Sequence, residues 1–237
     1  MRLLLALLWW GLCTLPVHAL DIRPANVAVP AGPAHADLWL DNPEPTAWTG
    51  QARLYRWTQE GDEERLVPAA EVAISPAQLD IGAGQGQRLR VIRLGAAPQR
   101  AQQGYRLILT PAAGAAPGLP RYSLPVFLEP ATEVPPVSRL GVIAAGSPAA
   151  PRLQLYNNGD GHAHLADLVF VDDRGRRQRL IDGLAGYVLP HSRRSWALPA
   201  RPDGYAGGRF RARLDHAEEA PLSAAAPEIA APAQAGL

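Results

Sequence analysis

The sequence predicts an all-β protein, and two observations carry that prediction. Short apolar runs with a period of two recur along residues 20–215, and they are broken by Pro, Gly, Asn and Asp. Apolar spacing of helical period is almost absent. An alternating strand buries one face and wets the other, and closely spaced turn residues return the chain antiparallel. We therefore expect antiparallel β-sandwiches.

The N-terminus has the pattern of a secretory signal peptide. Arg2 precedes an apolar run from Leu3 to Leu15, and the small residues Val17 and Ala19 flank His18. The alternative is a membrane anchor, but the run is shorter than the roughly 20 residues that cross a bilayer. We expect cleavage after Ala19, a mature chain that begins at Leu20, and no membrane insertion.

Cysteine usage and charge exclude several classes of protein. The one cysteine, Cys13, lies inside the expected signal peptide, so the mature chain would have no disulfide, cysteine nucleophile or thiolate metal site. Removal of residues 1–19 from 237 leaves 218, which suits two domains of about 100 residues each. The formal net charge of +1 gives no general reason to expect a nucleic acid as partner.

The predicted strands form two series. The first comprises Val27–Val29, Ala36–Leu40, Gln51–Trp57, Leu89–Leu94, Tyr105–Leu109 and Tyr122–Leu128. The second comprises Arg152–Tyr156, Ala163–Val171, Gln178–Ile181, Ser195–Leu198 and Arg209–Leu214. Between them, paired prolines stiffen the chain and deny it ladder hydrogen bonds. We expect an N-terminal domain at 20–130, a linker at 131–136, a C-terminal domain at 137–216 and a disordered tail at 217–237.

Short motifs in both halves point to one family by their order and spacing. The first half has Leu38-Trp39-Leu40-Asp41-Asn42, Trp57-Thr58-Gln59, Ser75-Pro76, Gln87-Arg88-Leu89-Arg90, Gly104-Tyr105-Arg106-Leu107 and Arg121-Tyr122-Ser123-Leu124-Pro125-Val126-Phe127. The second has Leu155-Tyr156-Asn157-Asn158-Gly159, Gly186-Tyr187-Val188-Leu189-Pro190 and Arg193-Arg194-Ser195-Trp196. The chain resembles periplasmic chaperones of the chaperone-usher pathway, and among them the archaic branch that assembles spore-coat-like fimbriae.

The resemblance implies a fold and a function. The fold would be two immunoglobulin-like β-sandwiches in an L-shaped arrangement with a cleft between them. The function would be donor-strand complementation in the periplasm: the chaperone lends a strand to an incomplete pilin and delivers it to an outer-membrane usher. The family is not enzymatic, and we expect no cofactor and no metal.

The resemblance places the donor strand at Leu119–Leu128. By alternation Tyr122, Leu124, Val126 and Leu128 share one face, and Leu119 opens the segment. Periodicity alone also describes an ordinary strand that packs in its own core. Upstream, Ala116, Gly118 and Pro120 stand where the family usually has bulky apolar residues, so the plug would be short or displaced toward Tyr122.

The resemblance also implies basic residues that bind the pilin's C-terminal carboxylate in the cleft. Arginine meets both carboxylate oxygens at once, and by motif position we expect Arg90, Arg106 and Arg121 in this role. The alternative for each is a solvated strand face. Relatives often have a basic residue in the first strand, where this chain has Asn26, and Arg23 is the candidate substitute.

Other motifs favour structural explanations. Gly82-Ala83-Gly84-Gln85-Gly86 is not followed by a helix, which favours a turn over a phosphate-binding loop. His162 and His164 share a strand face, but no third metal ligand is recognisable nearby. Asp173-Arg174-Gly175 has the pattern of a hairpin turn, so the basic run up to Arg179 is expected to be a solvated loop.

Two other functions are alternatives for an exported β-sandwich: a carbohydrate-binding or adhesive protein, and a hydrolase. An adhesin is expected to expose aromatic residues, whereas Trp39, Trp57 and Trp196 lie inside strand patterns and are predicted to be core; Trp48 is the exception. A hydrolase needs a nucleophile or acid-base set, and no such signature is present in the sequence, so no catalytic residue is predicted.

Overall fold

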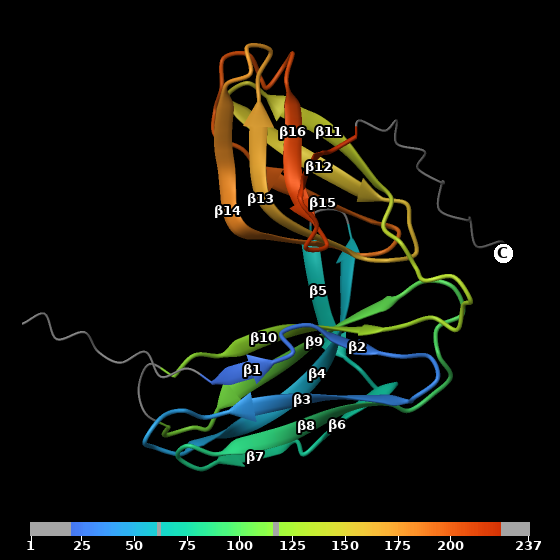
Figure 1. Ribbon diagram of the computed structural model, residues 1–237, viewed down its shortest axis with the longest axis vertical. Helices are drawn as coiled ribbons and strands as arrows, with labels where there is room; N and C mark the ends of the chain where they lie inside the picture. Colours follow the sequence, from blue (N-terminus) through green and yellow to red (C-terminus); the bar gives the residue numbers. More distant parts are fainter. Residues whose placement is uncertain (1–19, 61–62, 116–118, 224–237) are drawn as a thin grey trace, which may run out of the picture.

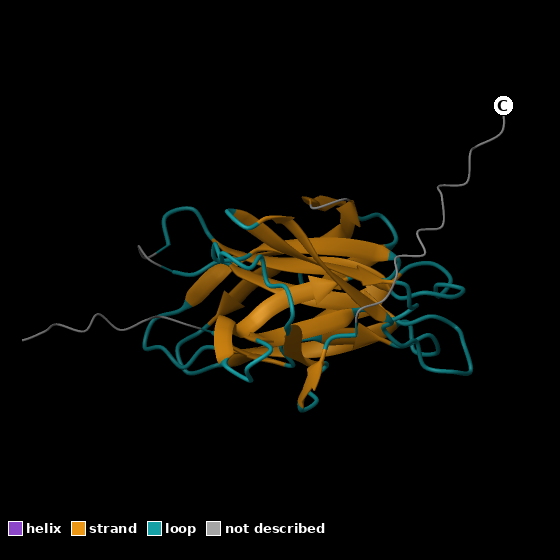
Figure 2. Ribbon diagram, turned by 90° about the horizontal axis from the view of Figure 1, so that it is seen from above, coloured by secondary structure: helices purple, strands orange, loops and turns teal. Residues whose placement is uncertain are grey.

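The computed structural model describes residues 20–60, 63–115 and 119–223, and it shows two lobes built from strands (Figure 1). Throughout these described ranges every regular element is a strand (Figure 2). No helix in them is long and apolar enough to span a membrane. The expected signal peptide, residues 1–19, lies outside the described residues. The predicted all-β class is confirmed.

The N-terminal lobe is a sandwich of two sheets. One has the strand order β1-β3-β8-β6, and the other has the order β2-β10-β9-β4-β5 with β7 paired to β4. The strands are β1 (Asp21–Arg23), β2 (Val27–Val29), β3 (His35–Asp41), β4 (Trp48–Glu60), β5 (Glu63–Pro68), β6 (Val72–Ser75), β7 (Gln78–Ile81), β8 (Gly86–Arg93), β9 (Gln103–Pro111) and β10 (Tyr122–Leu128). Leu38 and Leu40 from one sheet and Leu107 and Val126 from the other are fully buried in one core.

The C-terminal lobe is a second, smaller sandwich. Its sheets have the orders β11-β12-β15 and β14-β13-β16-β17. The strands are β11 (Leu140–Ser147), β12 (Ala150–Asn157), β13 (Ala163–Val171), β14 (Arg177–Val188), β15 (Ser192–Ala197), β16 (Arg209–Leu214) and β17 (Glu219–Pro221). Its core gathers Leu153, Leu155, Leu165 and Phe170, each with no exposed surface. The predicted linker, residues 131–136, lies between β10 and β11.

Alternation explains the strands, and it corrects two expectations about tryptophan. Leu38 and Leu40 face the core, so Trp39 between them faces outward and is 50% exposed, although we expected it inside. Trp48, expected to be the exception, begins β4 and is buried. Trp57 and Trp196 are buried as predicted.

The predicted disordered tail is also wrong in its first residues. Arg211 to Arg213 of β16 pair with Pro221 to Glu219 of β17, and Leu222 is buried against the second core. Three residues are too short a run to show a period of two, but the ladder and one apolar side chain suffice to hold them. Residues 224–237 lie outside the described residues.

The hairpin of β4 and β5 joins the lobes. β4 begins in the N-terminal sandwich, and its last residues and β5 rise toward the C-terminal lobe (Figure 1). β5 pairs only with β4 in the described sheet. This hairpin brings Gln59 and Glu64 to the cleft between the lobes.

Candidate functional site

An aromatic cluster closes the bottom of the cleft between the two lobes. Trp57 of β4 and Phe127 of β10 meet Tyr187 and Leu189 of the C-terminal lobe, and all four are buried. The rings of Trp57 and Tyr187 cross edge-on with centroids 5.7 Å apart. Gly104 of β9 pairs with Phe127, and a Cβ there would lie 3.0 Å from a methyl carbon of Leu189, so a larger residue would require the Leu189 side chain to shift.

Gln59 fastens the lobes next to this cluster. Its Nε2 donates to the Tyr187 carbonyl at 2.9 Å, and its Oε1 accepts from the Leu189 amide at 2.9 Å. The side chain thus pairs with the β14 backbone as a neighbouring strand would. Arg194 adds an ion pair to Glu64 of β5 at 2.7 Å. Both contacts lie on the β4 side of the cleft.

Arg106 occupies the floor of the cleft. It lies on β9 opposite Pro125 of β10 and Tyr55 of β4. Its guanidinium stacks 3.7 Å from the Trp57 ring centroid and 5.6 Å from that of Tyr187. Burial lowers the pKa of Arg106, while Glu64 acts in the opposite sense. Across the described residues no carboxylate forms an ion pair with Arg106. A half-buried cation without an acidic partner is suited to bind an anion.

A hollow of about 400 Å³ opens between the lobes and includes Asn26, Gln102, His162 and His164 in its lining. Asn26 directly precedes β2, whose Val27 pairs with Val126 of β10. His162 and His164 both line this hollow, and both rings contact Tyr187, so they lie on one side of the strand as their spacing predicts. In the described part of the chain no group of three or more His, Cys, Asp or Glu residues is arranged to hold a metal ion.

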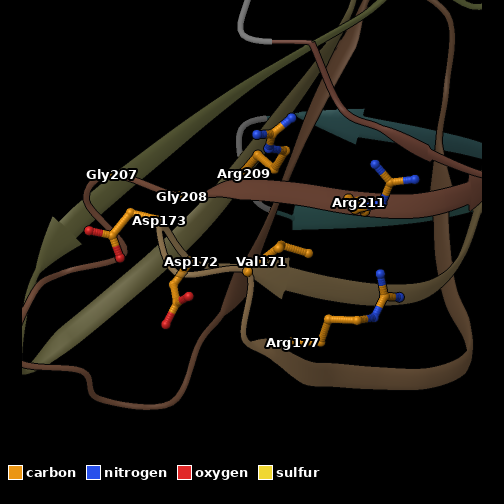
Figure 3. A pocket seen from close by; sticks show the side chains of 9 residues that line it. Val171, Asp172, Asp173, Arg177, Gly207, Gly208, Arg209 and Arg211 are labelled. Atoms are coloured by element: carbon orange, nitrogen blue, oxygen red, sulfur yellow. The ribbon is translucent and has the colours of Figure 1, made fainter.

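A second hollow, of about 460 Å³, lies far from the cleft on the C-terminal lobe. Figure 3 shows Asp172 and Asp173 at one end and Arg177, Arg209 and Arg211 at the other. Glu219 forms ion pairs with both Arg177 and Arg211, so most of this charge is neutralised locally.

The glycine-rich segment and the Asp173-Arg174-Gly175 segment are turns, as we expected, but the basic run is not a loop up to Arg179, because Arg177 and Arg179 lie on β14. Asp172 accepts hydrogen bonds from the Arg174 and Arg176 amides, and Gly175 has a φ of 77°, which makes the predicted hairpin turn. Gly84 has a φ of 65° in the turn that connects β7 to β8. Neither loop precedes a helix.

Part of the sequence matches the model of a known protein family. The model of the pili and flagellar-assembly chaperone, PapD N-terminal domain, matches residues 19–112. Residues 19–112 thus match a PapD-type N-terminal domain. The family that the model describes consists of assembly chaperones, not enzymes. A comparison with curated proteins found no match.

Solved structures resemble the PapD-type domain and the C-terminal lobe together. A chain of the CsuC–CsuE chaperone–tip adhesion subunit pre-assembly complex from archaic Csu pili of Acinetobacter baumannii has a TM-score of 0.70 at 21% identity, over 88% of this chain and 100% of that one. The Escherichia coli chaperone DraB has a TM-score of 0.61 at 16% identity, over 89% of this chain and 98% of DraB. A chain of the Salmonella enterica complex of SafA pilin with the SafB chaperone has a TM-score of 0.60 at 17% identity, over 88% of this chain and 96% of that one. These likenesses confirm the two-domain, immunoglobulin-like fold.

Only one of the three predicted anchor residues lies in the cleft of this fold. Arg90 lies on β8 in the other sheet of the PapD-type domain, where it donates two hydrogen bonds to Asp37 at 2.6 and 2.8 Å. Arg121 is exposed just before β10. Arg23, the suggested substitute, is bonded to Asp41 on the same sheet as Arg90. Arg106 alone among them stands beside the interdomain contact.

The predicted donor face turns toward the core of its own domain. Leu124, Val126 and Leu128 are buried in the core of the PapD-type domain, and Leu119 and Tyr122 pack against it. The ordinary-strand alternative describes these side chains, because the period of two directs them inward. On the opposite face of β10, Ser123 is exposed, and Pro125 and Phe127 are buried. Ala116 and Gly118 lie outside the described residues.

β10 nevertheless has a half-free edge. β9 pairs with all of β10, from Tyr122 to Leu128, but β2 pairs only with Val126 to Leu128. Among the described strands none covers the other side of Tyr122 to Pro125. An unpaired backbone edge of this kind can receive another strand.

Proposed function

We propose that this chain is an exported pilus-assembly chaperone that holds a pilin subunit in the cleft between its domains. The PapD-type domain supports this function. So do the relatives: one was solved as a chaperone–tip adhesion subunit complex and another as a pilin–chaperone complex. Delivery to an outer-membrane usher is part of the same proposal.

Arg106 is the single observation that carries the proposal. It is a cation at the cleft floor that stacks on Trp57. Among the described residues it has no ion pair: Glu64 acts on it electrostatically but is bonded to Arg194. The terminal carboxylate of a bound subunit would supply that partner, and a guanidinium can meet both of its oxygens. Of the three predicted anchors we retain Arg106 and assign Arg90 and Arg121 no contact with the carboxylate.

The open edge of β10 supports donor-strand complementation in a modified form. A subunit strand that adds to Tyr122–Pro125 would take up the backbone groups that β2 leaves unpaired. The four predicted plug side chains are already committed to the chaperone's own core. In the proposed complex this stretch therefore contributes its backbone edge, and Ser123 is its exposed side chain.

Matched arginine variants test the proposal. The chain is co-expressed with pilin subunits of the same genome, purified from the periplasm, and the bound partner is identified by mass. Arg106→Ala should weaken subunit binding by about 2 to 5 kcal/mol, because it leaves a buried carboxylate without its counterion. Arg90→Ala removes an arginine outside the cleft and should leave recovery unchanged. Equal recovery with both variants would refute the carboxylate site, and no pilin with the unaltered chain would refute the function.

Export through residues 1–19 belongs to this proposal as well. N-terminal sequencing of periplasmic protein should begin at Leu20. Retention of Met1, or protein in the membrane fraction, would contradict it.

A further inference from the structure

His162 belongs to one domain by sequence and binds the other. It directly precedes β13 of the C-terminal lobe, yet its ring lies flat on Phe127 of β10, with centroids 3.6 Å apart and planes at 4°. Its backbone amide donates to Gln102 Oε1 at 2.8 Å, and its Nδ1 lies 2.8 Å from the same oxygen. One residue thus makes three contacts across the cleft, two through its side chain and one through its backbone amide.

The partners of Gln102 determine which nitrogen of His162 has the proton. Gln102 Nε2 donates to both carboxylate oxygens of Glu129, at 2.8 and 3.0 Å. The amide oxygen therefore points at His162, so Nδ1 must be the donor and Nε2 of the neutral ring has no proton. Within the described part of the chain no group is recorded as a hydrogen-bond partner of Nε2. Protonation would place a new N–H and a positive charge there.

Aromatic and imidazole rings surround His162. Tyr187 of β14 lies 5.9 Å away, centroid to centroid. His164 of β13 stacks on His216 at 4.7 Å, and its buried Nδ1 has no hydrogen-bond partner in the described residues. Arg213 of β16 adds a permanent positive charge near His164, and Asp167 pairs with it at 2.7 Å.

Two carboxylates face this group. Asp215 follows β16 and accepts a hydrogen bond from the His164 amide, and Glu129 reaches His162 only through Gln102. Asp160, whose carbonyl accepts from the Gln102 amide, directs its carboxylate to His191. Burial lowers the pKa of His162 to about 4, a shift that Asp215 opposes and His164 reinforces. Burial also lowers the pKa of His164. At neutral pH both rings are uncharged.

We propose that His162 is a positioning residue for the cleft: its neutral ring holds the C-terminal domain against β10, and its protonation releases that domain. Gln59 and His162 attach the domains on different strands, β4 and β10. Loss of the His162 contacts weakens the β10 side, where Phe127 still packs against Tyr187. The β4 side keeps Gln59, Trp57 and the ion pair of Glu64 with Arg194, so the C-terminal domain can turn about that side as a hinge. We call this pH-dependent attachment through His162 the latch, and it does not rest on the proposed function. The opened cleft should also bind a subunit less well, and that expectation does rest on the proposed function.

Small-angle X-ray scattering of the free chain tests the latch without any pilin. Between pH 7 and pH 4 the unaltered protein should show an increase in its maximum dimension while its far-UV circular dichroism is retained. His162→Phe preserves the flat stack on Phe127 but cannot titrate, so its scattering should not change over this interval. His35→Phe is the control, because His35 is exposed at the start of β3. It should behave like the unaltered chain.

Nuclear magnetic resonance of the His162 ring identifies the titration that drives the change. The scattering transition should coincide with protonation of that ring. Unchanged scattering at a pH where His162 is protonated would overturn the inference. So would a transition of equal size in His162→Phe, whether or not the far-UV signal is lost. Pilin binding enters none of these measurements, so their failure is distinguishable from failure of the proposed function.

Discussion

Arg106 and His162 occupy the same interdomain contact but differ as cations. Arg106 stacks on Trp57 and stays charged at any pH at which the protein is folded, since an arginine cannot be deprotonated in a protein. His162 stacks on Phe127, which belongs to the same buried cluster as Trp57, and is uncharged at neutral pH. The first provides a permanent charge for a ligand, and the second provides an attachment that depends on pH. Different residues of the interdomain contact thus bind the ligand and hold the C-terminal domain in place.

Trp57 supports both sides of this comparison, so its removal should have the largest effect. It is 1% exposed and touches Phe127, Tyr187 and Arg106. Trp57→Ala should lower the free energy of unfolding by about 3 to 5 kcal/mol, measured by urea denaturation. The control is Trp39→Ala at a half-exposed position, where the change should stay within about 0.5 kcal/mol. Similar losses for both would show that the cluster does not stabilise the contact.

Acid sharpens the comparison on the His162 side. The folded pKa of about 4 lies below the ordinary value of 6.5. The neutral ring therefore contributes stability that is complete above pH 6.5 and is lost as the pH falls toward 4. The loss should approach 3 kcal/mol, at about 1.36 kcal/mol per pKa unit. His162→Phe should reduce the slope of the free energy of unfolding against pH between pH 6.5 and 4.5, and the slope that remains should include the contribution of His164, whose pKa is also lowered.

The range from pH 6.5 to 4.5 separates the titration of His162 from that of the Glu71 carboxylate. Burial alone would raise the pKa of Glu71, but hydrogen bonds from Tyr105 and Arg56 outweigh it and hold the pKa at about 2. Its contribution is present above its ordinary value of 4.5 and is lost only below that pH. An unchanged slope in His162→Phe between pH 6.5 and 4.5 would assign the acid sensitivity to another group.

The Arg106 side can be sharpened by a substitution that preserves charge. Arg106→Lys retains a cation but loses the planar stack on Trp57 and the two-pronged contact with a carboxylate. Subunit binding should weaken by about 1 to 2 kcal/mol, less than for Arg106→Ala. Calorimetric titration with a purified subunit is the measurement. Full affinity in the lysine variant would mean that charge alone suffices.

The ion pair between Glu64 and Arg194 should have the smallest effect. Both side chains are partly exposed, and the pair is 2.7 Å long. A double-mutant cycle with Glu64→Gln and Arg194→Gln should give a coupling of about 0.2 to 1 kcal/mol that 0.5 M salt largely removes. A coupling above that range would make this pair, and not Gln59, the main attachment on the β4 side.

Local patterns predicted the strands well, because a period of two is a property of neighbouring residues. Val27–Val29 and Ala163–Val171 match β2 and β13 residue for residue. The same period, applied strictly, also places Trp39 opposite Leu38 and Leu40, so its exposure was available from the sequence. The alternation of Leu124 and Val126 likewise fitted a core strand as well as a donor strand.

The composition of the site could not be predicted in this way, because it depends on pairing between distant segments. Arg90 and Arg106 occupy similar motif positions, but β8 pairs with β3 and β6, whereas β9 pairs with β4 and β10. Nothing local assigns their strands to different sheets. The contacts of His162 with Gln102 and of Gln59 with Tyr187 span 60 and 128 residues. No pattern in the sequence marks Gln102, and the motif Trp57-Thr58-Gln59 does not reveal that Gln59 bonds the backbone of the other domain.

The continuity of β4 has a consequence for how this protein comes apart. One uninterrupted strand runs from Trp48, in the core of the N-terminal domain, to Gln59, which is bonded to the backbone of the other domain. Fraying of that strand withdraws hydrogen bonds from both domains at once. The two sandwiches should accordingly melt as one cooperative unit, and slowed amide exchange at Leu189 should report on the integrity of a sandwich to which Leu189 does not belong.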